Sequence, residues 1–183
     1  MADGRADVLP GSTVIEVERV VSMPDRYEII QPVAGSGGFG RVAKALDSEL
    51  DRQVAIKILD PLFKERPSEQ DKERFRREAK TLASLSYPTI PAIYDVRFDD
   101  ANHDFKIVFE WIEGTTIRQS LVDRGPASLE TTRQWFGDIC GALAHAHAKG
   151  VIHRDIKPSN LIVTTNGSCY IVIGPEIQVL EKR

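Results

Sequence analysis

The sequence is poor in cysteine, which excludes two classes of small stabilised domain. Its 183 residues include only two cysteines, Cys140 and Cys169. Two thiols cannot form the disulfide framework of a small secreted protein or supply the four ligands of a structural zinc site. Both stand among apolar residues, so we expect them to be reduced, buried and structural.

The sequence also lacks a strong net charge and a long apolar run. A formal charge of −3 at pH 7 provides no general attraction to nucleic acid or to an anionic membrane. No apolar stretch reaches the length of a transmembrane helix, and the N-terminal residues, MADGRADVLPGS, lack the apolar core of a secretory signal. We therefore expect a cytoplasmic protein that has no nucleic-acid or membrane partner.

An ordinary globular composition is present, with 42% hydrophobic and 28% charged residues, enough for one large domain or two small lobes. Residues 1–26 contain prolines and scattered charges and predict an N-terminal tail. Apolar runs separated by turn residues then predict five strands, with a helix inserted after the third. That helix is expected at Glu69–Leu85, where Ala79 and Leu82 recur at helical spacing. The strands are expected at residues 27–33, 41–46, 54–59, 92–98 and 105–112.

The remainder of the chain is predicted to be mainly helical. A long helix is expected at Glu130–Lys149, and Gly150 ends it. We assign six residues to its apolar face: Trp135, Phe136, Ile139, Cys140, Leu143 and Ala144. Further on, Asn166-Gly167 is a hairpin turn signal between two short apolar strands, residues 161–163 and 169–173.

A glycine-rich loop follows the first expected strand, with glycines at positions 35, 37 and 40. Such a loop lets backbone N–H groups approach phosphate oxygens, and two folds use it. A dinucleotide-binding fold needs a helix directly after the loop and an acid about 20 residues on, where Asp60 stands. The polar run Asp47–Arg52 would break that helix early. The alternative needs a second strand and then a third that carries lysine in V-A-I-K. Residues 54–57 read Val-Ala-Ile-Lys, so we favour the alternative.

The most specific motif is the octet His153–Asn160, which reads His-Arg-Asp-Ile-Lys-Pro-Ser-Asn. It combines a possible proton acceptor, Asp155, with a cation, Lys157, and a neutral oxygen donor, Asn160. The proline between them stiffens the loop. The octet closely resembles the catalytic loop of eukaryotic-type serine/threonine protein kinases, H-R-D-x-K-P-x-N, and V-A-I-K and the glycine loop fit the same family.

The resemblance implies an α+β, protein-kinase-like fold. Residues 27–112 would form an N-lobe, with a five-stranded antiparallel sheet and helix C, and residues 113–183 a partial helical C-lobe. It also implies a serine/threonine protein kinase-like enzyme that binds ATP with Mg²⁺ and transfers the γ-phosphate to serine or threonine hydroxyls of a protein substrate.

The same resemblance assigns roles to individual residues. Asp155 would accept or orient the hydroxyl proton, and Lys157 would contact the transferred phosphate. Lys57 would pair with the α- and β-phosphates and with Glu78, and Asn160 would hold a magnesium ion. Backbone groups of Glu110 and Ile112 would bond adenine behind the gatekeeper Phe109, while Val42, Ala55 and Ile162 fit either an adenine sandwich or plain core. The full nucleotide-binding set is Ala34, Gly35, Ser36, Gly37, Gly38, Phe39, Gly40, Val42, Ala55, Lys57, Glu78, Glu110, Ile112 and Ile162.

The resemblance stops at Val172. Val172-Ile173-Gly174 stands where the family has Asp-Phe-Gly, and valine has no oxygen for magnesium. No activation segment or later helices follow before Arg183. We expect weakened metal binding, impaired transfer and an exposed apolar face on the long helix that could associate with a partner. Two alternatives stay open: a pseudokinase fragment that binds nucleotide or protein, and a frame-shifted, non-functional copy.

Overall fold

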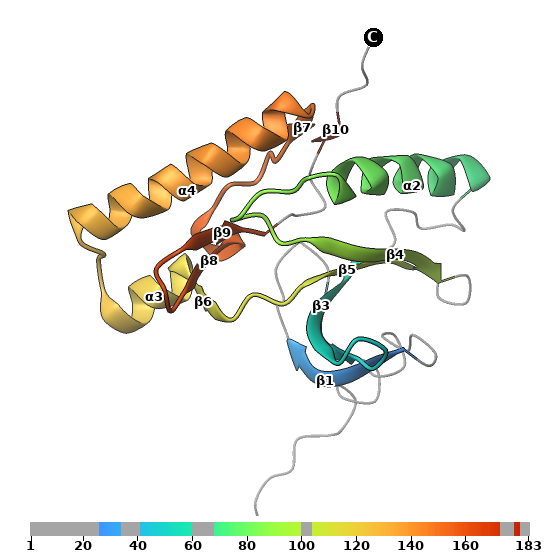
Figure 1. Ribbon diagram of the computed structural model, residues 1–183, viewed down its shortest axis with the longest axis horizontal. Helices are drawn as coiled ribbons and strands as arrows, with labels where there is room; N and C mark the ends of the chain where they lie inside the picture. Colours follow the sequence, from blue (N-terminus) through green and yellow to red (C-terminus); the bar gives the residue numbers. More distant parts are fainter. Residues whose placement is uncertain (1–25, 34–40, 60–67, 100–103, 173–177, 180–183) are drawn as a thin grey trace, which may run out of the picture.

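The computed structural model describes residues 26–33, 41–59, 68–99, 104–172 and 178–179. Its first half is a five-stranded antiparallel sheet in the order β1-β2-β3-β5-β4 (Figure 1). The strands are β1 (Tyr27–Val33), β2 (Arg41–Asp47), β3 (Arg52–Leu59), β4 (Ile93–Asp99) and β5 (Asp104–Glu110). The predicted five strands are confirmed. Because β2 is a strand where a dinucleotide-binding fold needs a helix, that alternative is excluded.

The two faces of β2 and β3 carry different side chains, as the two-residue period of a strand requires. One face contributes to a buried cluster of Tyr27, Ala43, Ala45, Val54, Ile56, Ile58 and Val108. On the other face the register pairs Val42 with Lys57 and Lys44 with Ala55. Directly paired residues share a face, so these four side chains lie together. Ala55 packs against a second core cluster that includes residues of the long helix, so this face is directed toward the second half of the chain.

Helix α2 (Glu69–Ala83) lies beside β4 (Figure 1). Its buried residues Ala79 and Leu82, together with Leu85 just after its end, confirm the predicted helical spacing. The helix ends two residues before the prediction, because the backbone N–H of Leu85 bonds to the carbonyl of Leu82 in a turn at 3.0 Å.

The second half contains two helices and short strands. The helices are α3 (Ile117–Arg124) and α4 (Leu129–Ala148), with a 3₁₀ turn, η1 (Pro158–Asn160). The strands are β6 (Gly114–Thr116), β7 (Val151–Ile152), β8 (Leu161–Thr164), β9 (Cys169–Ile171) and β10 (Gln178–Val179). The predicted hairpin is confirmed: β8 pairs antiparallel with β9, and Gly167 at its turn has φ of 88°. Within the described ranges, no helix is both long and apolar enough to cross a bilayer.

Strand β6 pairs with β8, and this close approach depends on Gly114. A Cβ at Gly114 would stand 2.5 Å from the carbonyl oxygen of Val163 on β8. Any side chain would push the two strands apart. Gly114 therefore allows β6, which follows the five-stranded sheet in the chain, to lie directly against β8.

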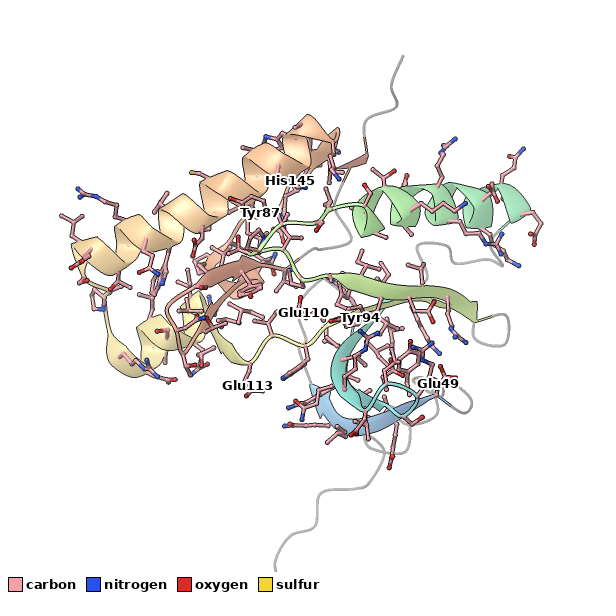
Figure 2. The ribbon with its side chains drawn as sticks, in the orientation of Figure 1. Glu49, Tyr87, Tyr94, Glu110, Glu113 and His145 are labelled. Atoms are coloured by element: carbon pink, nitrogen blue, oxygen red, sulfur yellow. The ribbon has the colours of Figure 1, made fainter. Side chains whose placement is uncertain are left out.

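The connector between α2 and β4 attaches the first half to α4. Tyr87 stacks near His145 of α4, with ring centroids 5.4 Å apart, and Figure 2 shows the two side chains together beneath that helix. Thr89 donates to the carbonyl of Asp138 at 3.3 Å and accepts from the backbone N–H of Ile171 at 2.9 Å. Lys149 donates to the carbonyl of Ser84. These contacts join α2, α4 and β9 into one packed body.

Helix α4 corrects our assignment of its apolar face. Trp135 and Ile139 are buried, as expected, but Phe136 is 62% exposed, and Cys140 and Ala144 are exposed too. Positions four apart stack on one side of a helix, so 136, 140 and 144 form one side while residues 135, 139, 142 and 146 face β7 and β9. The buried, structural role predicted for both cysteines is thus confirmed for Cys169 and wrong for Cys140.

A buried carboxylate joins the start of β1 to the β2–β3 turn. Asp47 is fully buried and accepts two bonds from Arg26, at 2.8 and 2.9 Å, and one from Arg52 at 3.2 Å. The hydrogen bond from Arg26 outweighs burial and, together with Arg52, lowers the pKa of Asp47 to about 2. Stability from this group is present above its unfolded pKa of 3.8 and is lost as the pH falls toward 2.

Replacing Asp47 with asparagine is therefore expected to lower the free energy of unfolding by about 1–2 kcal/mol at pH 7. The loss should shrink as the pH falls below 4, because Asp47 of the unfolded wild-type chain then takes up a proton that the folded form does not bind until near pH 2. Urea unfolding at several pH values measures this difference. Glu49, which also pairs with Arg26 but is 65% exposed, supplies the control: Glu49→Gln should cost less than about 0.5 kcal/mol. An equal loss in both variants would contradict the account.

Candidate active site

The octet forms a sharply turned loop that begins directly after β7 and ends in the 3₁₀ turn η1. Arg154 has φ of 62°, a left-handed conformation that is uncommon for a residue with a side chain. This turn separates a buried His153 from an exposed Arg154. The backbone N–H of Asp155 donates to Nδ1 of His153 at 3.3 Å, so the ring proton lies on Nε2, which donates to the carbonyl oxygen of Val172 at 3.0 Å. Burial lowers the pKa of His153, which keeps this neutral form.

Asp155, Lys157 and Asn160 form a compact polar cluster. The Asn160 side-chain amide donates to Oδ2 of Asp155 at 2.6 Å and to the Asp155 carbonyl at 2.9 Å. The Lys157 ammonium lies 3.0 Å from the same Oδ2. Desolvation acts to raise the pKa of Asp155, but the hydrogen bonds from Lys157 and Asn160 outweigh it and leave the pKa below its usual value. Asp155 is therefore an ionised carboxylate at neutral pH.

Lys57 extends the cluster from the sheet side. Its side chain is 5% exposed, and burial lowers its pKa to about 8, against the attraction of Asp155 and with the repulsion of Lys157. The three charges thus act on one another, although they come from β3 and from the loop. Glu78 lies half-buried on α2, and its pairing with Lys57 stays a prediction.

In the alignment predicted from the sequence, Val172 takes the place of the acid of the family's Asp-Phe-Gly. Its backbone N–H donates to the carbonyl of Asn160 at 2.9 Å, and its own carbonyl accepts from His153. Val172 is thus attached to both ends of the octet but contributes no side-chain oxygen. Magnesium requires oxygen ligands in a near-octahedral set. The octet contributes the side-chain oxygens of Asp155 and Asn160, and the described residues contain no group of three or more His, Cys, Asp or Glu side chains that could hold a metal. The donor set does not fit a firmly anchored magnesium ion.

The expected adenine site lies between the sheet and β8. Val42 and Ala55 share the face that carries Lys57, Phe109 is buried, and Ile162 on β8 contacts the position of Gly114. Glu110 is held by Ala92, since its backbone N–H donates to the Ala92 carbonyl at 2.8 Å and its carboxylate accepts from the Ala92 N–H at 3.2 Å.

Ile112 follows in the segment Trp111–Glu113, which links β5 to β6. Figure 2 shows Glu113 on this link and Glu110 at the end of β5 before it. The adenine-binding roles stay predictions. The glycine-loop positions Ala34, Gly35, Ser36, Gly37, Gly38, Phe39 and Gly40, and Asp60 of the excluded alternative, lie outside the described residues.

Sequence reasoning did not identify a second cluster at this link. Lys44 lies over the ring of Trp111, with its ammonium 4.5 Å from the centroid. Trp111 donates from its indole N–H to Glu113 at 2.8 Å. The two-residue spacing of Lys44 from Val42 places it on the sheet face that carries Val42, Ala55 and Lys57, here called the cleft face. The sequence does not show its aromatic partner, because Trp111 is on a distant segment.

Comparison with known proteins agrees with this geometry. Residues 27–173 match the protein kinase domain family. The chain is 38% identical over 145 residues to serine/threonine-protein kinase PknL of Mycobacterium tuberculosis, covering 79% of this chain and 35% of that protein. It is 39% identical over 143 residues to serine/threonine-protein kinase PrkC of Bacillus subtilis, covering 78% of this chain and 21% of that protein. For serine/threonine-protein kinase PknB of Mycolicibacterium smegmatis, the identity is 36% over 152 residues, covering 82% and 24%.

The chain thus spans between 21% and 35% of the length of these relatives. Within the matched region lie the five-stranded sheet, the strand that reads Val-Ala-Ile-Lys and the octet loop. The family match and the fold lead to the same conclusion: the chain belongs to the eukaryotic-type serine/threonine protein kinase family.

Proposed function

We propose that this chain binds ATP between the five-stranded sheet and the octet loop, and that its transfer of the γ-phosphate to protein serine or threonine hydroxyls is impaired. The observation that carries the proposal is the convergence of Lys57, Asp155 and Lys157. Two cations and one carboxylate, from separate elements, lie within electrostatic reach of one another. A cytoplasmic location and a protein substrate belong to the same proposal.

In the proposed reaction, Lys57 and Lys157 hold phosphate oxygens by charge. Asp155 is ionised because its pKa is low, so it can accept the hydroxyl proton of the substrate. The hydroxyl oxygen then forms a bond to the γ-phosphorus as the bond to the ADP oxygen breaks, and ADP leaves with that electron pair. Before this can happen Lys157 must turn from Asp155 toward phosphate, since its ammonium now neutralises the carboxylate.

We attribute the impaired phosphate transfer to the lack of an anionic magnesium ligand at Val172. In this family magnesium offsets the charge that develops on the β- and γ-phosphates. Here Val172 provides no anionic ligand, and Asn160 can offer only the neutral oxygen of its amide, whose nitrogen bonds Asp155. Lys57 and Lys157 must therefore balance the rest of the negative charge on the phosphates. This favours binding over efficient transfer and supports a second candidate function, a pseudokinase module that binds nucleotide or a protein partner.

A thermal-shift titration with ATP, with and without magnesium, tests both candidates. The proposal predicts that ATP stabilises the protein. A free ATP concentration 100 times the dissociation constant adds about 2.7 kcal/mol to the free energy of unfolding. Stabilisation that does not depend on magnesium favours the binding module. A complete absence of stabilisation would contradict both candidates.

Residual transfer is measured separately with radiolabelled ATP and a generic serine/threonine substrate. Its baseline is the double variant Lys57→Ala, Asp155→Ala, which removes a phosphate-binding cation and the proton acceptor. Transfer no greater than in that variant would leave the binding module as the function.

A further inference from the structure

The link between β5 and β6 is held from both sides by contacts that the proposed function has not used. On one side Ala92 bonds the backbone and the carboxylate of Glu110. On the other side a cluster of Lys44, Trp111 and Glu113, here called the linker clamp, connects the link to β2. It attaches residues 111–113 to β2 through side chains.

The clamp consists of three mutually supporting contacts. The Lys44 ammonium lies 4.5 Å from the centre of the Trp111 ring, in cation–π range, and 3.7 Å from the carboxylate of Glu113. The same carboxylate accepts the indole N–H of Trp111 at 2.8 Å. Lys44 is only 16% exposed, although Glu113 is 79% exposed. The lysine is thus the shielded centre of the clamp, and a contact with a partly desolvated cation is stronger than one in open solvent.

Lys44 belongs both to the linker clamp and to the cleft face of the sheet. The register pairs Lys44 with Ala55 on β3 and Ala55 with Phe109 on β5. Lys44 also follows Val42 at a two-residue interval, so its side chain projects from the cleft face of the sheet. One end of the clamp is therefore in the row of residues proposed to cover adenine. The other end is the peptide segment proposed to bond the adenine edge.

We infer that Lys44, Trp111 and Glu113 are positioning residues for nucleotide binding: they fix the linker peptide groups relative to the strand above the adenine site. This inference rests on the proposed ATP site. An adenine edge can bond a backbone segment well only if the segment already has the right orientation, because ordering it on binding reduces affinity. Loss of the clamp should weaken recognition of adenine without affecting contacts to phosphate.

The test is calorimetric titration of the full chain with three probes: ATP, adenosine and inorganic tripolyphosphate. Lys44→Met removes the cation and keeps an apolar chain of similar length. We expect it to weaken binding of ATP and adenosine by about three- to tenfold, the range of a cation–π contact, and to leave tripolyphosphate unchanged. Trp111→Phe, which keeps an aromatic ring but removes the indole N–H, should act in the same direction, and Lys44→Arg should restore binding.

The matched control is Arg52→Met. It removes another cation from the sheet, one that lies 3.4 Å from the centre of the Tyr94 ring. Because Arg52 also bonds Asp47, this variant should lower thermal stability but leave the affinity for adenosine unchanged. If wild-type protein binds ATP and Lys44→Met binds ATP and adenosine equally well, the clamp inference is wrong while the proposed function stands. If tripolyphosphate binding falls in parallel, the effect is not one of linker position and the inference also fails. No binding of ATP by the wild type would overturn the proposed function and the inference with it.

Discussion

At pH 7, replacing Lys57 with methionine is expected to stabilise the protein by about 3 kcal/mol and to weaken ATP binding at least about tenfold. The stabilisation follows from burial, which lowers the pKa of Lys57 from 10.5 to about 8. Below pH 8 the folded protein carries the full cost of a desolvated ammonium, and methionine removes it. The loss of binding follows from the proposed contact of that ammonium with phosphate. Lys57 would thus be retained for function at the expense of stability.

The difference in stability between wild type and Lys57→Met is expected to depend on pH. Between pH 8 and 10.5 unfolded Lys57 holds a proton that the folded form has lost, so wild-type stability rises with pH across this window. The advantage of Lys57→Met should therefore be largest below pH 8 and nearly absent above 10.5. Chemical unfolding of both proteins across this range measures the difference, in which the other titrating groups cancel.

Lys80, an exposed lysine on α2, is the control for this series. Lys80→Met should change the free energy of unfolding by less than about 0.5 kcal/mol at any of these pH values. A Lys57→Met protein that is less stable than wild type at pH 7, or a gain that stays constant to pH 11, would refute the assignment of Lys57 as a desolvated cation.

Introducing aspartate at Val172 is expected to make ATP binding depend on magnesium. Val172 is bonded through its backbone to Asn160 and His153, so a carboxylate at this position would enter the same cluster as Asn160 and Asp155. A third acidic or amide oxygen source would complete a donor set for magnesium. We expect magnesium to strengthen ATP binding by about tenfold or more in Val172→Asp and by much less in wild type.

Asparagine at the same position shows whether the magnesium response needs the negative charge of aspartate, because the two side chains have nearly the same size. Val172→Asn introduces an oxygen ligand without a negative charge, so its response to magnesium should lie well below that of the aspartate variant. In the presence of EDTA, Val172→Asp should be less stable than wild type, since a second carboxylate is then added beside Asp155 without a bound metal ion. The prediction is wrong if magnesium affects ATP binding equally in all three proteins.

The local sequence was sufficient for the five-stranded sheet, α2, α4 and the β8–β9 hairpin, because each of these elements carries its own pattern, whereas α3, β6, β7 and β10 were not predicted. The alternation in β2 and β3 and the helical spacing of Ala79 and Leu82 depend only on neighbouring residues. Helix α4 shows the limit of this reasoning. Trp135 and Phe136 are adjacent and equally apolar, and only the position of β7 and β9 determines that Trp135 is buried and Phe136 is not.

The sequence by itself determined the family and the identity of the octet and of Lys57, because these motifs are contiguous and specific. It also determined that Val172 brings no side-chain oxygen to the expected metal site, since this is a property of the residue type. Only the tertiary structure decided that Lys57 is desolvated within reach of Asp155, that His153 and Asn160 hold Val172, and that Lys44 contacts Trp111. These properties arise from segments far apart in the chain, whose separation and burial depend on how the sheet, the link and the loop pack together.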